Sequence, residues 1–329
     1  MKTIKIKKTL QPVQIGNMIH FGLGQEGLER TIDSSQENIH LLKYLNEELD
    51  RKFLNLSEQE LSKKVFLLQE KGLLTTNDYS ETEQYSRNIN FFEWIDTSSN
   101  VNPQKYQEKL ANSCVLIVGL GGIGANVCEI LVRMGLKSFI IVDFDQVEAS
   151  NLTRQGTYFF NDIGKNKVDV VEDYIKKIDP AISVNKINTR IEKKDDLRKI
   201  FIAYDFDLSI CCADYPKYLI DKWFDELSFE FNRPFVSGSY ASTVINTFCI
   251  NPGKTITSSQ LYGEYGTSTD QLLKNLKVPT SVIAPITYMA AGLVSYQAQS
   301  VLTGLNYKTE AVQIDIFNWK AYQYDITKK

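Results

Sequence analysis

The first 80 residues alternate between short apolar and polar runs before they turn helical. Period-two alternation in TIKIKKTL, PVQIGNMIHFG and EGLERTID predicts strands joined by glycine turns. Helical spacing follows over residues 36–49, and a second helix is expected after Ser57, because Ser57-x-x-Glu60 is a capping-box pattern. The combination resembles a winged-helix module, so we expect residues 1–80 to form a small domain that can pair a peptide against an edge strand.

Beyond residue 80 the pattern changes to strands that alternate with helices. Residues 81–112 are expected to form a linker and a lead-in helix, and helical segments are expected at 124–134 and 166–178. The predicted strands are CVLIVGL, SFIIVDFD, SVNKINTRI, DLSICCAD and PFVSGSYAS, and EAVQIDIFNWKAYQYDI predicts antiparallel edge strands. This order is typical of an α/β fold with a doubly wound, mostly parallel Rossmann-like sheet, which we expect over residues 81–329.

The longest apolar stretch, residues 281–302, contains Pro285, two glutamines and several hydroxyl residues, which favours a buried helix over a membrane span. The chain is 43% hydrophobic and 23% charged, and its N-terminus has no signal-peptide core, so we expect a cytoplasmic protein that uses no membrane. Its net charge of −3 argues against nucleic-acid binding.

Cysteine and histidine are scarce. The five cysteines contain no C-x-x-C pair, so no zinc site is expected. The neighbours Cys211 and Cys212 are interpreted as buried strand residues. Only His20 and His40 occur, so any chemistry in the larger domain must proceed without a histidine.

A glycine-rich turn stands between the first strand and helix of that domain. Gly119-x-Gly121-x-x-Gly124, with Gly122 inside it, has the spacing and context of a phosphate-binding loop. Glycines let the backbone approach phosphates, and the helix N-terminus supplies free N–H groups. Asp143 ends the next strand, where an acid can bind ribose hydroxyls. The motif fits any adenosine-containing ligand.

Polar and charged residues that could act on phosphates follow this loop. They are Asp145, Asn151, Arg154 and Gln155 in VDFDQVEASNLTRQ, and Lys165 and Lys167 in DIGKNKVDVVEDY. Asp214, at the end of DLSICCAD, is a candidate Mg²⁺ ligand, since open sheets bind ligands at their carboxyl edge. Hydride transfer needs no such set, whereas nucleotidyl transfer does, because charge builds on the leaving pyrophosphate.

These segments carry a family resemblance. GLGGIG, VDFD, NLTRQ, GKNK, the CCAD strand end, PFVSGSY and VIAPITYMAAG resemble, in that order, the ThiF/MoeB family of adenylating enzymes, relatives of the ubiquitin-activating enzymes. Together with YSRN, NPQKYQEKLAN, DIGKNK, ADYP and the N-terminal module, they are most similar to the microcin C nucleotidyltransferase subgroup. The resemblance implies a homodimer, Mg²⁺, a nucleoside triphosphate and a ribosomally made precursor peptide whose carboxyl group is activated.

The resemblance also implies roles for individual residues. The glycines and Asp143 hold the nucleotide, and Asn151, Arg154, Gln155 and Lys167 bind and polarise its phosphates, with Lys167 nearest the α-phosphate. Asp214 holds Mg²⁺, and Arg87, in QYSRN, reaches the phosphates of the partner subunit. ATP and CTP remain alternatives for the nucleotide. Carboxylate adenylation needs no general base, which agrees with the missing histidines.

The sequence departs from most family members, which carry two zinc-binding C-x-x-C pairs, and no cysteine matches a thioester-forming position. Three other functions stay open. The chain could activate a ubiquitin-like sulfur carrier protein, although this explains the first 80 residues poorly. It could be a binding module that has lost turnover, or an NAD-dependent oxidoreductase; the retained phosphate-directed residues argue against both.

Overall fold

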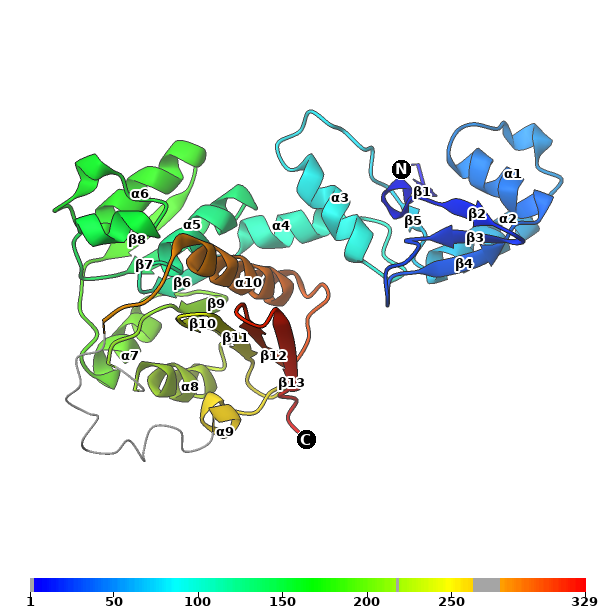
Figure 1. The fold of residues 1–329 in the computed structure, drawn as a ribbon. Coiled ribbons are helices and arrows are strands. Elements are labelled where there is room, and N and C mark those ends of the chain that lie inside the picture. The colour runs from blue at the N-terminus through cyan, green and yellow to red at the C-terminus, as the bar shows by residue number, and fades with distance from the viewer. Residues whose placement is uncertain (1–2, 217–218, 263–278) are drawn as a thin grey trace. The chain divides into compact units, whose positions relative to one another are not determined.

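The computed structural model describes residues 3–216, 219–262 and 279–329 (Figure 1). The chain divides into two units, Met1–Lys109 and Leu110–Lys329, each with its own core. Among the described residues, no helix is both long and apolar enough to cross a membrane.

The first unit contains the small sheet and the helices that were predicted for it. Three antiparallel strands run in the order β2-β3-β4, and β1 pairs with β5. TIKIKKTL forms only a two-residue strand, because the chain then tightens into a 3₁₀ turn. The elements are β1 (Lys5–Ile6), η1 (Lys8–Leu10), β2 (Val13–Ile15), β3 (Met18–Phe21), β4 (Arg30–Asp33), α1 (Gln36–Leu45), η2 (Arg51–Phe53), α2 (Glu58–Glu70), β5 (Leu74–Thr75), α3 (Ser86–Ile95) and α4 (Gln104–Asn112), the last of which crosses into the second unit.

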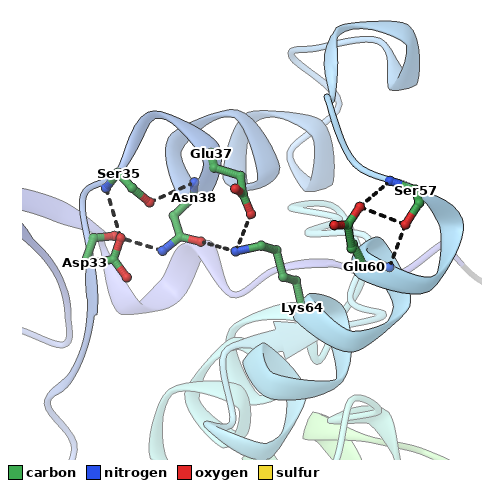
Figure 2. A network of polar contacts seen from close by, with 7 residues as sticks. All are labelled: Asp33, Ser35, Glu37, Asn38, Ser57, Glu60 and Lys64. Carbon is green, nitrogen blue, oxygen red and sulfur yellow. Dashed lines mark hydrogen bonds and ion pairs between the residues drawn. The ribbon is translucent and has the colours of Figure 1, made fainter.

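Side chains cap the first two helices, as Figure 2 shows. Ser57 accepts a hydrogen bond from the Glu60 N–H, and the Glu60 carboxylate accepts one from the Ser57 N–H at 2.8 Å, which confirms the capping box. Lys64 joins the two helices through Glu37, at 2.6 Å, and Asn38, at 3.3 Å.

Helix α1 ends at Leu45 and not at residue 49 as predicted. The residues that follow are acidic, and negative charge at a helix C-terminus opposes the helix dipole. Glu47 has a φ of +63°, so the chain has left the helix there. The acidic residues after α1 therefore face solvent from a turn.

Helix α3 is tied to the first unit by a buried carboxylate. Glu93 is fully buried and accepts hydrogen bonds from Thr9 (2.7 Å), Thr75 (2.6 Å) and Tyr79 (2.6 Å). Because an unpaired buried charge is costly, these donors fix α3 against β5 and η1. The segment that was expected to be a linker therefore belongs, up to Lys109, to the first unit.

The second unit is built on an eight-stranded sheet in the order β13-β12-β11-β10-β9-β6-β7-β8. Strands β10, β9, β6, β7 and β8 are parallel, and β11, β12 and β13 add antiparallel edge strands. This confirms the predicted mostly parallel, Rossmann-like sheet. The strands are β6 (Cys114–Val118), β7 (Ser138–Val142), β8 (Ser183–Ile187), β9 (Leu208–Cys211), β10 (Phe235–Ala241), β11 (Val244–Ile250), β12 (Glu310–Asp315) and β13 (Lys320–Asp325).

Helices cover both faces of this sheet (Figure 1). One face packs against α5 (Gly124–Arg133), α6 (Lys167–Ile178) and α10 (Ala284–Thr303), and the other against α7 (Lys194–Ala203), α8 (Ile220–Phe231) and α9 (Ser258–Tyr262). Helix α7 was not predicted, although parallel β8 and β9 demand a crossover. Helix α10 confirms the expected buried helix and ends at Gly304, whose φ of +72° permits the left-handed cap.

Lys7 makes the stability of the first unit depend on pH. Its side chain is 1% exposed and donates a 2.8 Å hydrogen bond to the carbonyl of Asp96. Burial lowers the pKa of Lys7 from 10.5 to about 8.

We therefore expect the free energy of unfolding to rise as the pH increases from about 8 to 10.5. In that window the unfolded chain still binds the Lys7 proton and the folded chain has released it. The gain should be about 3 kcal/mol relative to Lys7→Met, measured by chemical denaturation. Parallel pH profiles for the two proteins would contradict this account.

Candidate nucleotide-binding site

A cleft of about 570 Å³ opens at the carboxyl ends of β6, β7, β9 and β10 in the second unit. This is the edge at which open α/β sheets bind ligands, and the volume suits a nucleotide-sized molecule. The predicted site residues that line it are Gly119, Gly121, Gly122, Asp143, Asp145, Asn151, Arg154, Gln155, Lys167 and Asp214. The folded chain therefore brings together residues that lie up to 95 positions apart in the sequence (214 − 119).

Steric limits explain the glycines of the loop. Gly119 has a φ of +90°, and a side-chain carbon there would lie 2.7 Å from the Ala213 nitrogen. A carbon at Gly124 would lie 1.9 Å from the Gly119 carbonyl oxygen, so Gly124 lets the loop fold back on itself beneath the cleft. Gly121 has open space within 4 Å, which leaves room for a ligand to reach the backbone.

Asp143 fastens this loop to the end of β7. One carboxylate oxygen accepts the Leu120 N–H at 2.5 Å, and the other accepts the Asp145 N–H at 2.8 Å. Burial raises the pKa of Asp143, while the charge of Lys167 and these two hydrogen bonds act in the opposite direction. Each oxygen keeps a further lone pair that could accept a hydrogen bond from a ligand.

Lys167 brings a buried positive charge to the cleft. It is the first residue of α6 and only 5% exposed, and its Nζ lies 2.9 Å from Asp145 Oδ2. The Lys167 N–H also donates to the Asp145 carbonyl at 3.0 Å, so side chain and backbone hold the same neighbour. A phosphate that enters the cleft could replace Asp145 as the partner of the Lys167 ammonium.

The 3₁₀ helix η3 (Ala149–Thr153) contains Asn151, and Arg154 and Gln155 follow it directly. Gln155 is 3% exposed and its Oε1 has no hydrogen-bond partner; the same holds for the buried Nε of Arg154. Buried polar atoms are rarely left unpaired, so these orphaned groups fit a site that a polar ligand completes. The residues present therefore fit a bound nucleotide.

Asp214 follows β9 and faces the same cleft. Among the described residues, no three histidine, cysteine, aspartate or glutamate side chains gather closely enough to enclose a metal ion. A nucleotide-bound Mg²⁺ does not need such a cage, because one or two carboxylates and the phosphate oxygens hold it. Asp214 fits that smaller role.

Three predicted residues do not join the cleft lining, namely Gly124, which lies beneath it, Lys165 and Arg87. Lys165 is exposed and pairs with Asp162 at 2.9 Å. Arg87 lies in the first unit, near the start of α3, where its exposed guanidinium pairs with Glu81. A position in a partner subunit's site, as the family resemblance implies for Arg87, is compatible with that exposure.

The structure adds residues that sequence reasoning missed. Asp221, in the first turn of α8, lines the cleft and accepts a hydrogen bond from Ser237 at 3.1 Å, and burial raises the pKa of its carboxyl. At the rim, the Arg190 guanidinium stands 4.9 Å from the Phe144 ring centre and 4.5 Å from that of Tyr215. The sequence signal for Asp221 was an acidic residue at the start of a helix that follows a strand. The contact of Arg190 with Phe144 and Tyr215 had no signal in the sequence.

The two glycines of the loop should respond differently to alanine. Gly124→Ala forces a carbon against the Gly119 carbonyl, so we expect it to cost at least about 1–3 kcal/mol and to abolish nucleotide binding. Gly121→Ala enters open space, and its stability should stay within about 0.5 kcal/mol of the parent. Thermal unfolding measures both, and equal effects would contradict the loop geometry.

Comparison with known proteins places this cleft in a family. The sequence pattern of the ThiF family matches residues 85–328. The molybdopterin-synthase adenylyltransferase of Escherichia coli (strain K12) is 29% identical over 202 residues, which cover 60% of this chain and 76% of that protein. The tRNA threonylcarbamoyladenosine dehydratase 2 of Saccharomyces cerevisiae is 32% identical over 155 residues, and the match covers 46% of this chain and about a third (34%) of that relative.

Solved structures resemble the whole chain. The structure of E. coli MccB with ATP has a TM-score of 0.81 at 23% identity and covers 99% of this chain and 97% of its own. PaaA has a TM-score of 0.75 at 21% identity, with 98% of this chain and 100% of its own covered. The predicted likeness to the microcin C nucleotidyltransferase fold is thereby confirmed. With the family pattern matched over most of its length, this chain belongs to the ThiF family.

Proposed function

We propose that this ThiF-family adenylyltransferase activates a carboxyl group of a ribosomally made precursor peptide with ATP, in the biosynthesis of a modified, antibiotic-like peptide. The observation that carries the proposal is the gathering of Lys167, Arg154 and the buried Gln155 side chain around an open glycine loop. We place the enzyme in the cytoplasm, where the peptide is made.

The reaction follows from the charges in the cleft. A carboxylate oxygen of the substrate attacks the α-phosphorus, the bond to the bridging oxygen breaks, and its electron pair leaves with pyrophosphate. Lys167 and Arg154 stabilise the negative charge that builds on the phosphate oxygens, and the carboxylate needs no general base. Mg²⁺ held by Asp214 would supply further charge neutralisation.

The other predicted residues position the nucleotide. Asp143 is proposed to accept hydrogen bonds from the ribose, and Asn151 and Gln155 to donate to the phosphates. The N–H groups at the start of α5 face the same loop and favour negative charge there. The five cysteines are free thiols, and burial raises the pKa of Cys211 and Cys212, which disfavours a thioester step.

The first unit supports a peptide as the substrate. The ThiF pattern starts at residue 85, so the small sheet and helices α1 and α2 are additions to it. The structures that match 99% of this chain include E. coli MccB with MccA-N7isoASN, and the likeness extends over this first unit. We infer that this additional unit holds the peptide.

A sulfur carrier protein is the second candidate substrate. It is supported by the sequence relatives, among them the molybdopterin-synthase adenylyltransferase and the adenylyltransferase and sulfurtransferase UBA4 of Meyerozyma guilliermondii, 30% identical over 205 residues that cover 61% of this chain and 44% of that relative. The two candidates share the cleft chemistry and differ in the acceptor.

We also propose a homodimer in which Arg87 serves the partner subunit's cleft. Helix α10 presents an exposed apolar row, with Tyr288, Met289 and Tyr296 each 37–45% exposed. Such a row on a helix is a candidate subunit contact.

Lys167→Ala and Arg154→Ala should reduce ATP–pyrophosphate exchange by at least about a hundredfold, because each removes a charge that stabilises the transition state. Folding should be retained. Lys165→Ala is the matched control, since Lys165 is exposed and outside the cleft. The proposed roles of Lys167 and Arg154 would be overturned if either cleft variant kept most of its exchange activity. They would also be overturned if Lys165→Ala lost as much activity as the cleft variants.

Mixing inactive subunits tests the role of Arg87. Arg87→Ala and Asp214→Ala chains, unfolded and refolded together, should regain about a quarter of the parent activity, since half the dimers would hold one intact site. Each variant refolded alone is the control. Mixed dimers that stay inactive would contradict an Arg87 that acts across subunits.

A further inference from the structure

One end of the cleft in the second unit is lined by residues for which the nucleotide has no proposed use. They come from the carboxyl end of β10 and the first turn of α8, and they are Asp221, Ser237, Gly238, Ser239 and Tyr240. We call this part of the lining the acceptor end. A carbon built on Gly122 would lie 3.6 Å from the Tyr240 hydroxyl, so the acceptor end adjoins the glycine loop.

The order of the strands indicates what the acceptor end faces. The ribose and the phosphates are proposed to lie at the ends of β7 and β6, and Asp214 follows β9. In the sheet, β10 lies beyond β9, on the side away from β6 and β7. A carboxylate that attacks the α-phosphorus approaches opposite the leaving pyrophosphate, through the part of the cleft that the nucleotide leaves open. The acceptor end is that part.

Asp221 brings a carboxyl group to the acceptor end. It accepts a hydrogen bond from the Ser237 hydroxyl at 3.1 Å, and its place in the first turn of α8 favours the ionised form. Burial acts in the opposite direction, because it raises the pKa of this carboxyl. Within the parts of the chain that the structure describes, no cation pairs with Asp221. A further hydrogen-bond donor, supplied by a ligand, would therefore stabilise the carboxylate.

The charge of Asp221 limits which acceptors suit this end of the cleft. The phosphates of the nucleotide are already negative, so an acceptor residue with a second carboxylate near Asp221 would meet repulsion. An N–H donor at the same position would form a charge-assisted hydrogen bond with the carboxylate. One side chain thus supplies both an attractive and a repulsive element, which is how binding sites separate similar ligands.

We propose that Asp221 is a specificity residue, which accepts a hydrogen bond from an N–H donor, an amide or an ammonium group, in the acceptor residue whose carboxyl group is activated. The proposal rests on the proposed function, because the acceptor end has this meaning only if the cleft forms an acyl adenylate. It adds the chemistry of the acceptor residue, which the glycine loop and Lys167 do not determine.

Acyl-sulfamoyl adenosines, which are stable analogues of acyl adenylates, test this without the natural peptide. The probes carry N-acetylated glutamine, lysine, glutamate or methionine on the sulfamoyl nitrogen, and these four side chains have similar lengths. Their dissociation constants for the full-length protein are measured by isothermal titration calorimetry. The glutamine or the lysine analogue should bind at least about tenfold more tightly than both the glutamate and the methionine analogues.

Paired variants connect this preference to Asp221. Asp221→Asn keeps the shape of the side chain and removes its charge, so the four dissociation constants should come within about threefold of one another. Asp225→Asn is the matched control, because Asp225 is a buried acid one turn further along α8 and outside the cleft lining. Its carboxylate accepts the N–H groups of Ser258, at 3.0 Å, and Ser259, at 3.4 Å. The control should keep the preference of the parent.

The ranking in the parent protein decides the proposal even if Asp221→Asn does not fold. The proposal is wrong if the glutamate or the methionine analogue binds as tightly as the better N–H donor, or if the preference survives in Asp221→Asn. It is also wrong if Asp221→Asn needs more Mg²⁺ for ATP binding, since Asp221 would then be a metal ligand.

Sulfamoyladenosine without an acyl group, and ATP with Mg²⁺, keep this result apart from failure of the proposed function. If neither binds to the parent protein, the adenylation proposal fails together with the role of Asp221. If either binds and the four acyl analogues are not distinguished, only the role of Asp221 fails.

Discussion

The cleft depends on one buried carboxylate. Asp143 accepts the N–H of Leu120, in the glycine loop, and the N–H of Asp145, in the loop that reaches Lys167. A carboxylate taken out of water is stable only with such donors, and in return it fixes the spacing of the two loops. The positions of the glycine backbone and of the Lys167 ammonium are therefore coupled, and a phosphate bound to one is within the reach of the other.

The groups brought together in the cleft suit stabilisation of charge more than general acid–base catalysis. The cleft presents Lys167, Arg154 and backbone N–H groups at the loop end, and it places Asp214 and Asp221 on the side of β9 and α8. Lys167 is itself paired with Asp145, so positive and negative groups share the cavity. Such a cavity suits a ligand with a polyphosphate and a second, electropositive part, such as a metal ion, and it suits a reaction controlled by charge stabilisation.

Much of this architecture was predictable, because its signals are local. The Ser57–Glu60 capping box and the glycine spacing require only neighbouring residues, and the alternation of strands and helices gave the sheet its class. Contacts between distant segments carried no such signal. Asp221 meets Ser237 only because α8 and β10 are packed together, and Arg190 meets Phe144 and Tyr215 only at the sheet edge. The acidic turn after α1 was predicted to be helical, because the hydrophobic periodicity does not register that acidic residues are unfavourable at a helix C-terminus.

The most direct test is a thermal-shift comparison of the full-length protein with Mg²⁺ and ATP, CTP, GTP or NAD. A ligand at a hundred times its dissociation constant stabilises the folded protein by about 2.7 kcal/mol, which a melting curve resolves. The account predicts a clear shift with one triphosphate and none with NAD, and the responding triphosphate identifies the nucleotide. A shift with NAD alone would contradict it, because the charged residues of the cleft would then serve a dinucleotide and an oxidoreductase would be the better assignment.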